Sequence, residues 1–208
     1  MSHNAIESWI CPPASVSNLQ TLNLAQNLLT AVPPWLCSGK AVRLISVDLS
    51  LNPVFSQESK ISKTVHRSDL KELCLSHCLL SQRDLQFVGQ FPNLTRLELS
   101  NFLPKVVTKY DNIVRDIDLS MLQFRTNLIE LLIHDVTLPD LPEDIHELVS
   151  LEVLDCRNNS LFMLPESLCK MPRLRVCLLS NNDLCVLPDR IGELTSLTEL
   201  RLDRNNVS

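Results

Sequence analysis

The chain has 208 residues, a net charge of −5, 45% apolar residues and 4% aromatic residues. The acidic balance argues against nucleic-acid binding, because proteins that bind phosphate backbones usually present a basic face. No apolar run approaches the roughly 20 residues of a membrane-spanning helix, and residues 1–8 lack the features of a secretory signal peptide. We therefore expect a soluble cytoplasmic protein with its cysteines reduced.

A leucine frame begins at Leu19 and recurs to the C-terminus. Its clearest form is Leu-x-x-Leu-x-Leu-x-x-Asn-x-Leu, as in the unit that Leu19 opens. The eight units open at Leu19, Leu44, Leu70, Leu94, Leu128, Leu151, Leu174 and Leu197, and the last four are 23 residues apart. A fixed period of this size indicates a stack of like units rather than one globular core.

Each unit predicts one short strand. The second and third frame leucines are two residues apart, so they face the same side of an extended chain. The frame asparagine can bond backbone groups where the chain leaves the strand. This predicts an asparagine ladder of Asn27, Asn52, Asn159, Asn182 and Asn205, broken at Cys78, Phe102 and Val136.

Segments outside the frame predict further features. Residues 1–18 form a cap-like segment in which Trp9 and Ile10 shield the first unit, and the leucine-repeat domain covers residues 19–208. Ser81 to Asp84, followed by apolar residues, predicts a short capped helix on the convex side.

The fourth unit is 34 residues long, which predicts an insertion at about 104–127. Its apolar residues from Ile113 onward have helical spacing. No polar cap follows the eighth strand, although terminal repeats usually have one.

These units resemble the leucine-rich repeat family over residues 19–208. Units five to seven carry Leu141-Pro142-x-x-Ile145, Leu164-Pro165-x-x-Leu168 and Leu187-Pro188-x-x-Ile191. That phrase resembles the 23-residue subclass of intracellular signalling scaffolds, such as the Ras–Raf scaffold and Scribble-type families. The resemblance implies an α/β repeat solenoid, a right-handed curved superhelix with a concave parallel β-sheet and convex 3-10 or short helices and loops.

The frame assigns the side chains that face outward from the predicted sheet. The N-terminal half is acidic, and the C-terminal half carries an apolar patch. An exposed apolar patch rimmed by charges is typical of a docking surface; a solvated face with scattered apolar residues is the alternative. The residues expected to bind a partner are Glu98, Glu130, Leu132, His134, Val153, Asp155, Arg157, Val176, Leu178 and Arg201.

The motif Cys74-x-x-His77-Cys78 is the one local pattern that could indicate a metal or a nucleophile. The ladder frame turns Cys78 inward and Cys74 outward, so the two thiols should not share a zinc ion. Cys74 and His77 should lie roughly 10 Å apart on an extended strand, beyond hydrogen-bond reach. We find no catalytic or metal-ligating constellation, and no cofactor is implied.

The sequence therefore predicts a monomeric, non-catalytic scaffold or adaptor that binds a partner protein on its concave face in intracellular signalling. The alternative is the recognition or regulatory module of a larger enzyme complex, such as a ubiquitin-ligase substrate receptor or a kinase or phosphatase regulator. The missing C-terminal cap favours that alternative.

Overall fold

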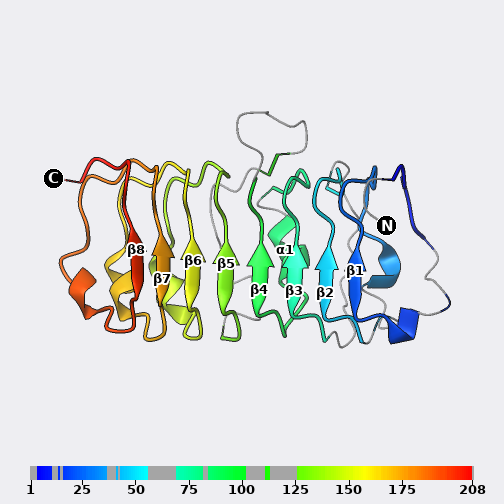
Figure 1. The fold of residues 1–208 in the computed structure, drawn as a ribbon, viewed down its shortest axis with the longest axis horizontal. Coiled ribbons are helices and arrows are strands. Elements are labelled where there is room, and N and C mark those ends of the chain that lie inside the picture. Colours follow the sequence, from blue (N-terminus) through cyan, green and yellow to red (C-terminus); the bar gives the residue numbers. More distant parts are fainter. Residues whose placement is uncertain are drawn as a thin grey trace.

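The computed structural model describes residues 4–10, 14, 16–36, 41, 43–55, 69–81, 84–101, 111–112 and 126–207. Eight parallel strands follow one another in chain order in a single open, curved sheet (Figure 1). The strands are β1 (Thr21–Asn23), β2 (Ser46–Asp48), β3 (Glu72–Cys74), β4 (Arg96–Glu98), β5 (Glu130–Leu132), β6 (Val153–Asp155), β7 (Val176–Leu178) and β8 (Glu199–Arg201). Each strand lies in one unit of the leucine frame, so the predicted repeat solenoid is confirmed.

The strands stay in one register from end to end. The central residue of each strand aligns with its equivalents in the neighbouring strands, so the frame leucines stack on one another. This residue is buried in β1 to β7, whereas Leu200 in β8 is 37% exposed. The aligned residues are Leu22, Val47, Leu73, Leu97, Leu131, Leu154, Cys177 and Leu200. Cys177 replaces a core leucine, and both Cys177 and Cys156 are buried free thiols.

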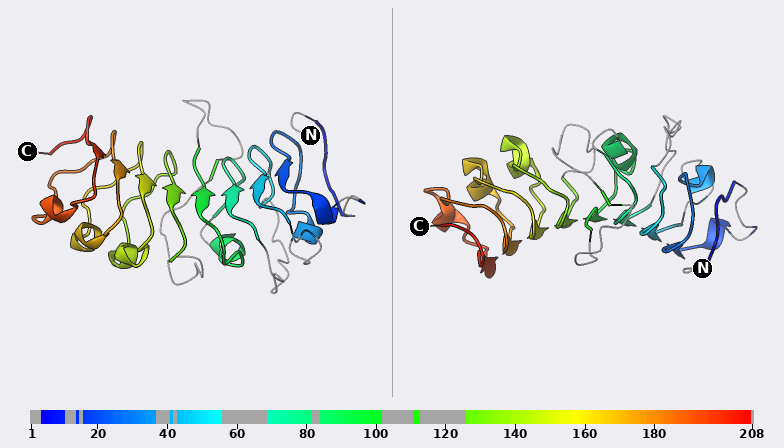
Figure 2. Two further views of the ribbon diagram at one scale, coloured as in Figure 1. Left: turned by 60° about the horizontal axis from the view of Figure 1, so that its bottom comes forward. Right: turned by 90° about the horizontal axis from the view of Figure 1, so that it is seen from above.

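Short helices lie on the side of the solenoid away from the sheet (Figure 2). They are η1 (Val16–Asn18), η2 (Pro34–Leu36), α1 (Leu85–Val88), η5 (Glu143–Glu147), η6 (Glu166–Lys170) and η7 (Ile191–Glu193). The helix predicted after Ser81 is α1. The Asp84 carboxylate accepts bonds from the Ser81 backbone N–H at 2.9 Å and from its hydroxyl at 2.7 Å. Phe87 on α1 packs edge-on against neighbouring phenylalanine rings, which anchors the helix to the core.

The asparagine ladder runs along the edge where the strands end. Asn52 shows its bonding pattern. Its amide nitrogen donates to the carbonyls of Leu24 and Leu49, both at 2.9 Å, and its amide oxygen accepts from the Leu29 backbone N–H at 3.0 Å. Each such side chain therefore links its own unit to the preceding one. The same type of link is made by Asn159, Asn182 and Asn205.

The expected ladder break at Phe102 is wrong, because Asn112 supplies the missing amide. Its amide nitrogen donates to the carbonyls of Leu75 and Leu99, at 2.7 and 2.8 Å. Its amide oxygen accepts from two backbone N–H groups of unit three. These are the bonds that a regular fourth-unit asparagine would make. The frame failed here because the chain reaches the ladder position ten residues later than usual.

The other two expected breaks have different outcomes. Cys78 is buried, and its thiol contacts the Leu49 carbonyl at 3.2 Å, the carbonyl of the preceding unit that a ladder asparagine would bond. Cys78 therefore fills the ladder position as a weak donor. Val136 is apolar and leaves a true gap in the row of donors, as expected.

Two further expectations fall largely outside the described residues. The insertion expected at about 104–127 is described only at residues 111–112 and 126–127, and the helical spacing from Ile113 lies wholly outside. We propose that the extra length is residues 102–111, because Asn112 resumes the ladder.

The N-terminal segment lies beside the first unit. The Ile6 backbone N–H donates to Asn27, as the N–H of a preceding repeat would. The Leu28 N–H in turn donates to the Ile6 carbonyl at 3.0 Å. Trp9 packs edge-on against Trp35 at 5.4 Å between ring centroids, as expected of a shield. Ile10 does not take part, because it is 72% exposed.

No helix among the described residues is both long and apolar enough to cross a membrane.

Candidate interaction surface

The concave face consists of the two outward residues of each three-residue strand. The register places Val153 next to Val176, and it places Asp155 between Leu132 and Leu178. All four apolar side chains are half-buried. The structure therefore brings the predicted apolar residues onto one surface, which we call the apolar patch (Leu132, Val153, Val176 and Leu178). Asp155 divides this patch. The leucine frame already placed Asp155 facing outward, but the sequence prediction did not take this division into account.

Asp155 and Arg157 form a closed ion pair at the centre of this surface. Two bonds join the guanidinium to the carboxylate, Nε to Oδ1 at 2.9 Å and Nη2 to Oδ2 at 2.6 Å. The hydrogen bond to Asp155 raises the pKa of Arg157, and nearby carboxylates add to the effect. Within this pair, the Asp155 side chain is buried. Since the charges satisfy each other, this part of the surface offers a partner mainly apolar contact.

Arg96 bridges two of the predicted acidic residues. Its Nη2 atom lies 3.0 Å from Glu98, and its Nε atom lies 2.9 Å from Glu130. Burial alone would lower the pKa of Arg96, but the two carboxylates outweigh it and raise that pKa. Arg201 pairs with Glu199 on the same strand. The predicted charged residues are thus placed on one face, mostly as internal pairs.

A hollow of about 260 Å³ lies over β1–β4, in the acidic half of the concave face. Asp48, Glu72 and Glu98 line it around Cys74. Burial, followed by the charges of Glu98 and Asp48, raises the pKa of Cys74 to about 12. Cys74 is therefore a neutral thiol and a poor nucleophile at neutral pH. The frame identified this half as acidic but could not show that it is hollowed.

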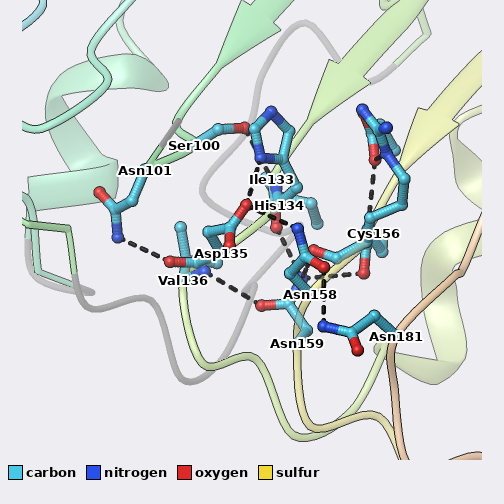
Figure 3. Close-up of polar contacts among 12 residues, drawn as sticks. Ser100, Asn101, Ile133, His134, Asp135, Val136, Cys156, Asn158, Asn159 and Asn181 are labelled. Carbon is cyan, nitrogen blue, oxygen red and sulfur yellow. Dashed lines mark hydrogen bonds and ion pairs between the residues drawn. The ribbon is translucent and has the colours of Figure 1, made fainter. Parts of the chain in front are cut away.

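His134 belongs to a row of polar side chains at the strand ends (Figure 3). His134 Nδ1 lies 2.8 Å from Asp135 Oδ2. The Asn158 amide donates to the same carboxylate at 3.0 Å, and the Asn181 amide donates to Asn158 at 2.8 Å. We call Asp135, Asn158 and Asn181 the rim row. Sequence reasoning missed it, although these residues share the frame position before the ladder.

The histidines do not assemble a catalytic or metal site among the described residues. Ser100 lies near His134, but its hydroxyl oxygen accepts from the His134 backbone N–H at 3.0 Å. His77 is buried, and its Nδ1 lies 2.7 Å from Asp111. Within the described ranges there is no cluster of three or more His, Cys, Asp or Glu that could hold a metal ion.

A third surface, missed by the sequence reasoning, is a groove of about 810 Å³ at the opposite ends of the strands. It crosses most of the units and is lined largely by polar residues that precede the strands. Ile45 and Ile129 are its exposed apolar members, each 38% exposed. Because its charges are of both signs, including Lys71 and Glu152, it shows no preference for one kind of partner.

Comparisons with known families agree with this geometry. Residues 112–208 match the family described as a leucine-rich repeat region, and residues 18–39 match the family described as Leucine Rich Repeat. The longer match begins at Asn112, where the ladder resumes. No curated protein sequence matches the chain.

Several solved structures share the fold. A leucine-rich repeat protein of Leptospira interrogans is 23% identical, with a TM-score of 0.65 over 100% of this chain and 55% of that chain. Human 5T4, or trophoblast glycoprotein, is 23% identical, with a TM-score of 0.63 over 96% of this chain and 74% of that chain. The Drosophila Toll–Spatzle complex gives 21% identity and a TM-score of 0.63 over 91% of this chain and 27% of that chain. The chain thus spans about half the length of the Leptospira protein and less of the Drosophila chain.

Proposed function

Starting from the membership of this chain in the leucine-rich repeat proteins, whose folds are general protein-interaction modules, we propose that it binds a partner protein on its concave face, centred on units four to eight. We further propose that it acts as a non-catalytic cytoplasmic scaffold or adaptor in signalling, as a monomer. The Leu-Pro motifs of units five to seven support the assignment of this chain to the scaffold subclass.

The apolar patch carries this proposal. Four half-buried aliphatic side chains cluster on an open face, beside charges that already neutralise one another. Protein interfaces typically have an apolar centre and a polar rim. A partner that covers Val176 and Leu178 gains apolar burial without having to desolvate an unpaired charge. The polar border of this interface would consist of Glu98, Glu130, His134, Arg157 and Arg201.

The recognition module of a larger enzyme complex is the second candidate. The observation that favours it is the chemical difference between the two halves of the concave face, an acidic hollow over β1–β4 and an apolar patch over β5–β7. Two such halves could hold a substrate and an enzyme subunit together. Captured proteins that include ubiquitin-ligase, kinase or phosphatase subunits would support this reading over a simple adaptor.

Affinity capture from native lysate with wild type and Leu178→Glu tests the proposal. A charge at Leu178, within the patch, should abolish capture, while circular dichroism and the melting curve stay unchanged. Leu28→Glu is the matched control, because it places the same charge at an apolar residue that is 41% exposed, outside the patch.

Partners that are lost with Leu178→Glu and kept with Leu28→Glu would support the concave site. Partners kept with both variants would place the interface on another surface.

A further inference from the structure

A separate groove lies on the side of the solenoid away from the sheet, where units five to seven carry their Leu-Pro pairs. It has a volume of about 430 Å³ and extends from Asp140 to Asp189. Units six and seven each contribute the residue before the Leu-Pro pair, the pair itself and the residue after it, and unit five contributes the same positions except its proline. We call this surface the Leu-Pro groove.

The groove has an exposed apolar lining that the fold does not require. Met163 and Val186 are each 54% exposed, above leucines that are buried or half-buried. Asp140 occupies the same frame position in unit five. Because that position accepts an aspartate, methionine and valine are not needed there for packing. Exposed apolar side chains clustered in a groove indicate a binding surface.

The charges that line the groove have a single sign. Glu143, Glu166 and Asp189 each follow the proline of their unit, so they form an acidic row along the solenoid. Asp140 adds a fourth carboxylate, and no basic side chain of the described residues lines the groove. The nearby Arg190 does not line the groove and pairs mainly with Glu193, at 2.7 Å from its Nε atom, although Glu166 of the row also helps to raise the pKa of Arg190.

We propose that the Leu-Pro groove binds an extended peptide segment of a partner in which basic and large apolar side chains alternate. Every second side chain of an extended chain lies on the same face, about 6.6–6.8 Å apart. The units fan out on this side from strands spaced about 4.8 Å apart, as Figure 2 shows. Because neighbouring side chains of an extended chain point to opposite faces, the segment lies edge-on in the groove. Its basic side chains face the acidic row, one per unit, and its apolar side chains face Met163 and Val186.

A labelled synthetic peptide of alternating lysine and leucine, seven residues long, tests the proposal by fluorescence anisotropy. The groove variant combines Glu143→Gln, Glu166→Gln and Asp189→Asn. Glu166→Gln keeps the oxygen that accepts from the Asp189 backbone N–H. We expect this variant to bind the peptide roughly tenfold more weakly, from three lost surface ion pairs.

The matched control removes the same charge from the concave hollow, with Asp48→Asn, Glu72→Gln and Glu98→Gln. It should bind the peptide within about twofold of wild type, and a lysine–serine peptide should bind wild type more weakly than the lysine–leucine peptide. Equal weakening by both triple variants would reduce the effect to general charge attraction and overturn the proposal, as would no binding to wild type. Circular dichroism checks that each variant is folded.

This inference does not depend on the concave site. Leu178→Glu should leave peptide binding unchanged, because the patch and the groove face opposite sides of the solenoid. Loss of peptide binding in Leu178→Glu would place the peptide on the concave face and overturn the groove assignment.

Discussion

The middle of the solenoid and its C-terminal units solve the same backbone problem in different ways. In units six to eight the frame asparagines Asn159, Asn182 and Asn205 bond the carbonyls at the strand ends. In units three and four these carbonyls are reached by Cys78 and by the distant Asn112. The sheet register is nevertheless continuous through both halves. The regular sheet therefore does not need a regular sequence of ladder asparagines, because a cysteine or a distant asparagine can bond these carbonyls, and the register also continues past Val136, which has no donor.

The turn beside the ladder shows the same contrast. The residue before the ladder has a positive φ in seven of the eight units, a conformation that asparagine and aspartate adopt more readily than most side chains. Units one to three have Gln26, Leu51 and His77 there, units five to seven have Asp135, Asn158 and Asn181, and unit eight has Arg204. Asp135, Asn158 and Asn181 tolerate this conformation and also make the hydrogen bonds of the rim row. Units five to seven are thus better adapted at this position.

The core leucines provide the strongest test of this comparison. Leu75 and Leu179 hold the same frame position and are fully buried. Replacing either with alanine should lower the free energy of unfolding by about 2–5 kcal/mol, from lost burial and the cavity left behind. Leu179→Ala should cost less, because a cysteine, Cys156, holds that position in the preceding unit. Urea denaturation measures both, and a larger loss from Leu179→Ala would contradict the expected order.

The second test compares the reactivity of a cysteine thiol in each half, Cys74 and Cys185. At pH 8, Cys74 with a pKa of about 12 should hold about a thousandfold less thiolate than an ordinary cysteine. Because the thiolate is the reactive form, the reaction of Cys74 with iodoacetamide should speed up as pH rises toward that pKa. Mass spectrometry of the labelled peptides follows the rate, with the partly exposed Cys185 as the internal comparison. Fast labelling of Cys74 at pH 8 would disprove its neutral state.

The ladder donors are the third comparison. Asn112→Ala and Asn182→Ala should each lower the free energy of unfolding by about 1–3 kcal/mol, because buried carbonyls and N–H groups lose their partners. A similar loss from both would show that the distant donor does the same work as the regular one. If Asn112→Ala were neutral in thermal denaturation, its ladder role would be refuted. Asn205→Ala, at a half-buried position, should show the smallest loss of the three.

The positive-φ turn gives the smallest effect. Leu51→Asn should stabilise the protein by up to about 1 kcal/mol, because asparagine relieves strain at that backbone conformation. The reverse change, Asn158→Leu, should destabilise it, since it adds strain and removes the bond to Asp135. Differential scanning calorimetry of the pair sharpens the contrast between the halves. A lower melting temperature for Leu51→Asn would show that apolar contacts of Leu51 outweigh the strain.

Most of the fold could be predicted because strand position and inward direction depend on spacing alone. Leu97 and Leu131 align as the frame requires, although 34 residues separate them. The ladder role of Asn112 could not be read from a fixed period, since ten extra residues precede it. The only available signal was that Asn112-x-Val114 repeats the ladder phrase.

The residues of the candidate surface could be predicted from the sequence, but the ion pairs between them could not. The frame placed Arg96, Glu98 and Glu130 on adjacent strands, yet which of them pair depends on side-chain conformations that spacing does not determine. The hollow around Cys74 and the Leu-Pro groove depend on curvature and on side-chain size. The acidic residue after each proline was visible in the sequence, but its meaning needed the exposed Met163 and Val186 beside it.

The bonds between Asn101 and Asn112 have a practical consequence. The Asn101 amide donates to the Asn112 carbonyl at 3.0 Å, and its oxygen accepts from the Asn112 N–H at 2.8 Å. This reciprocal clasp fixes both ends of the segment between them to the ladder. Loop-closure entropy grows slowly with length, by about 0.6 kcal/mol for each doubling. Foreign sequence could therefore be grafted between these two asparagines at low cost, which makes the position an insertion point for displaying epitopes or reporter peptides.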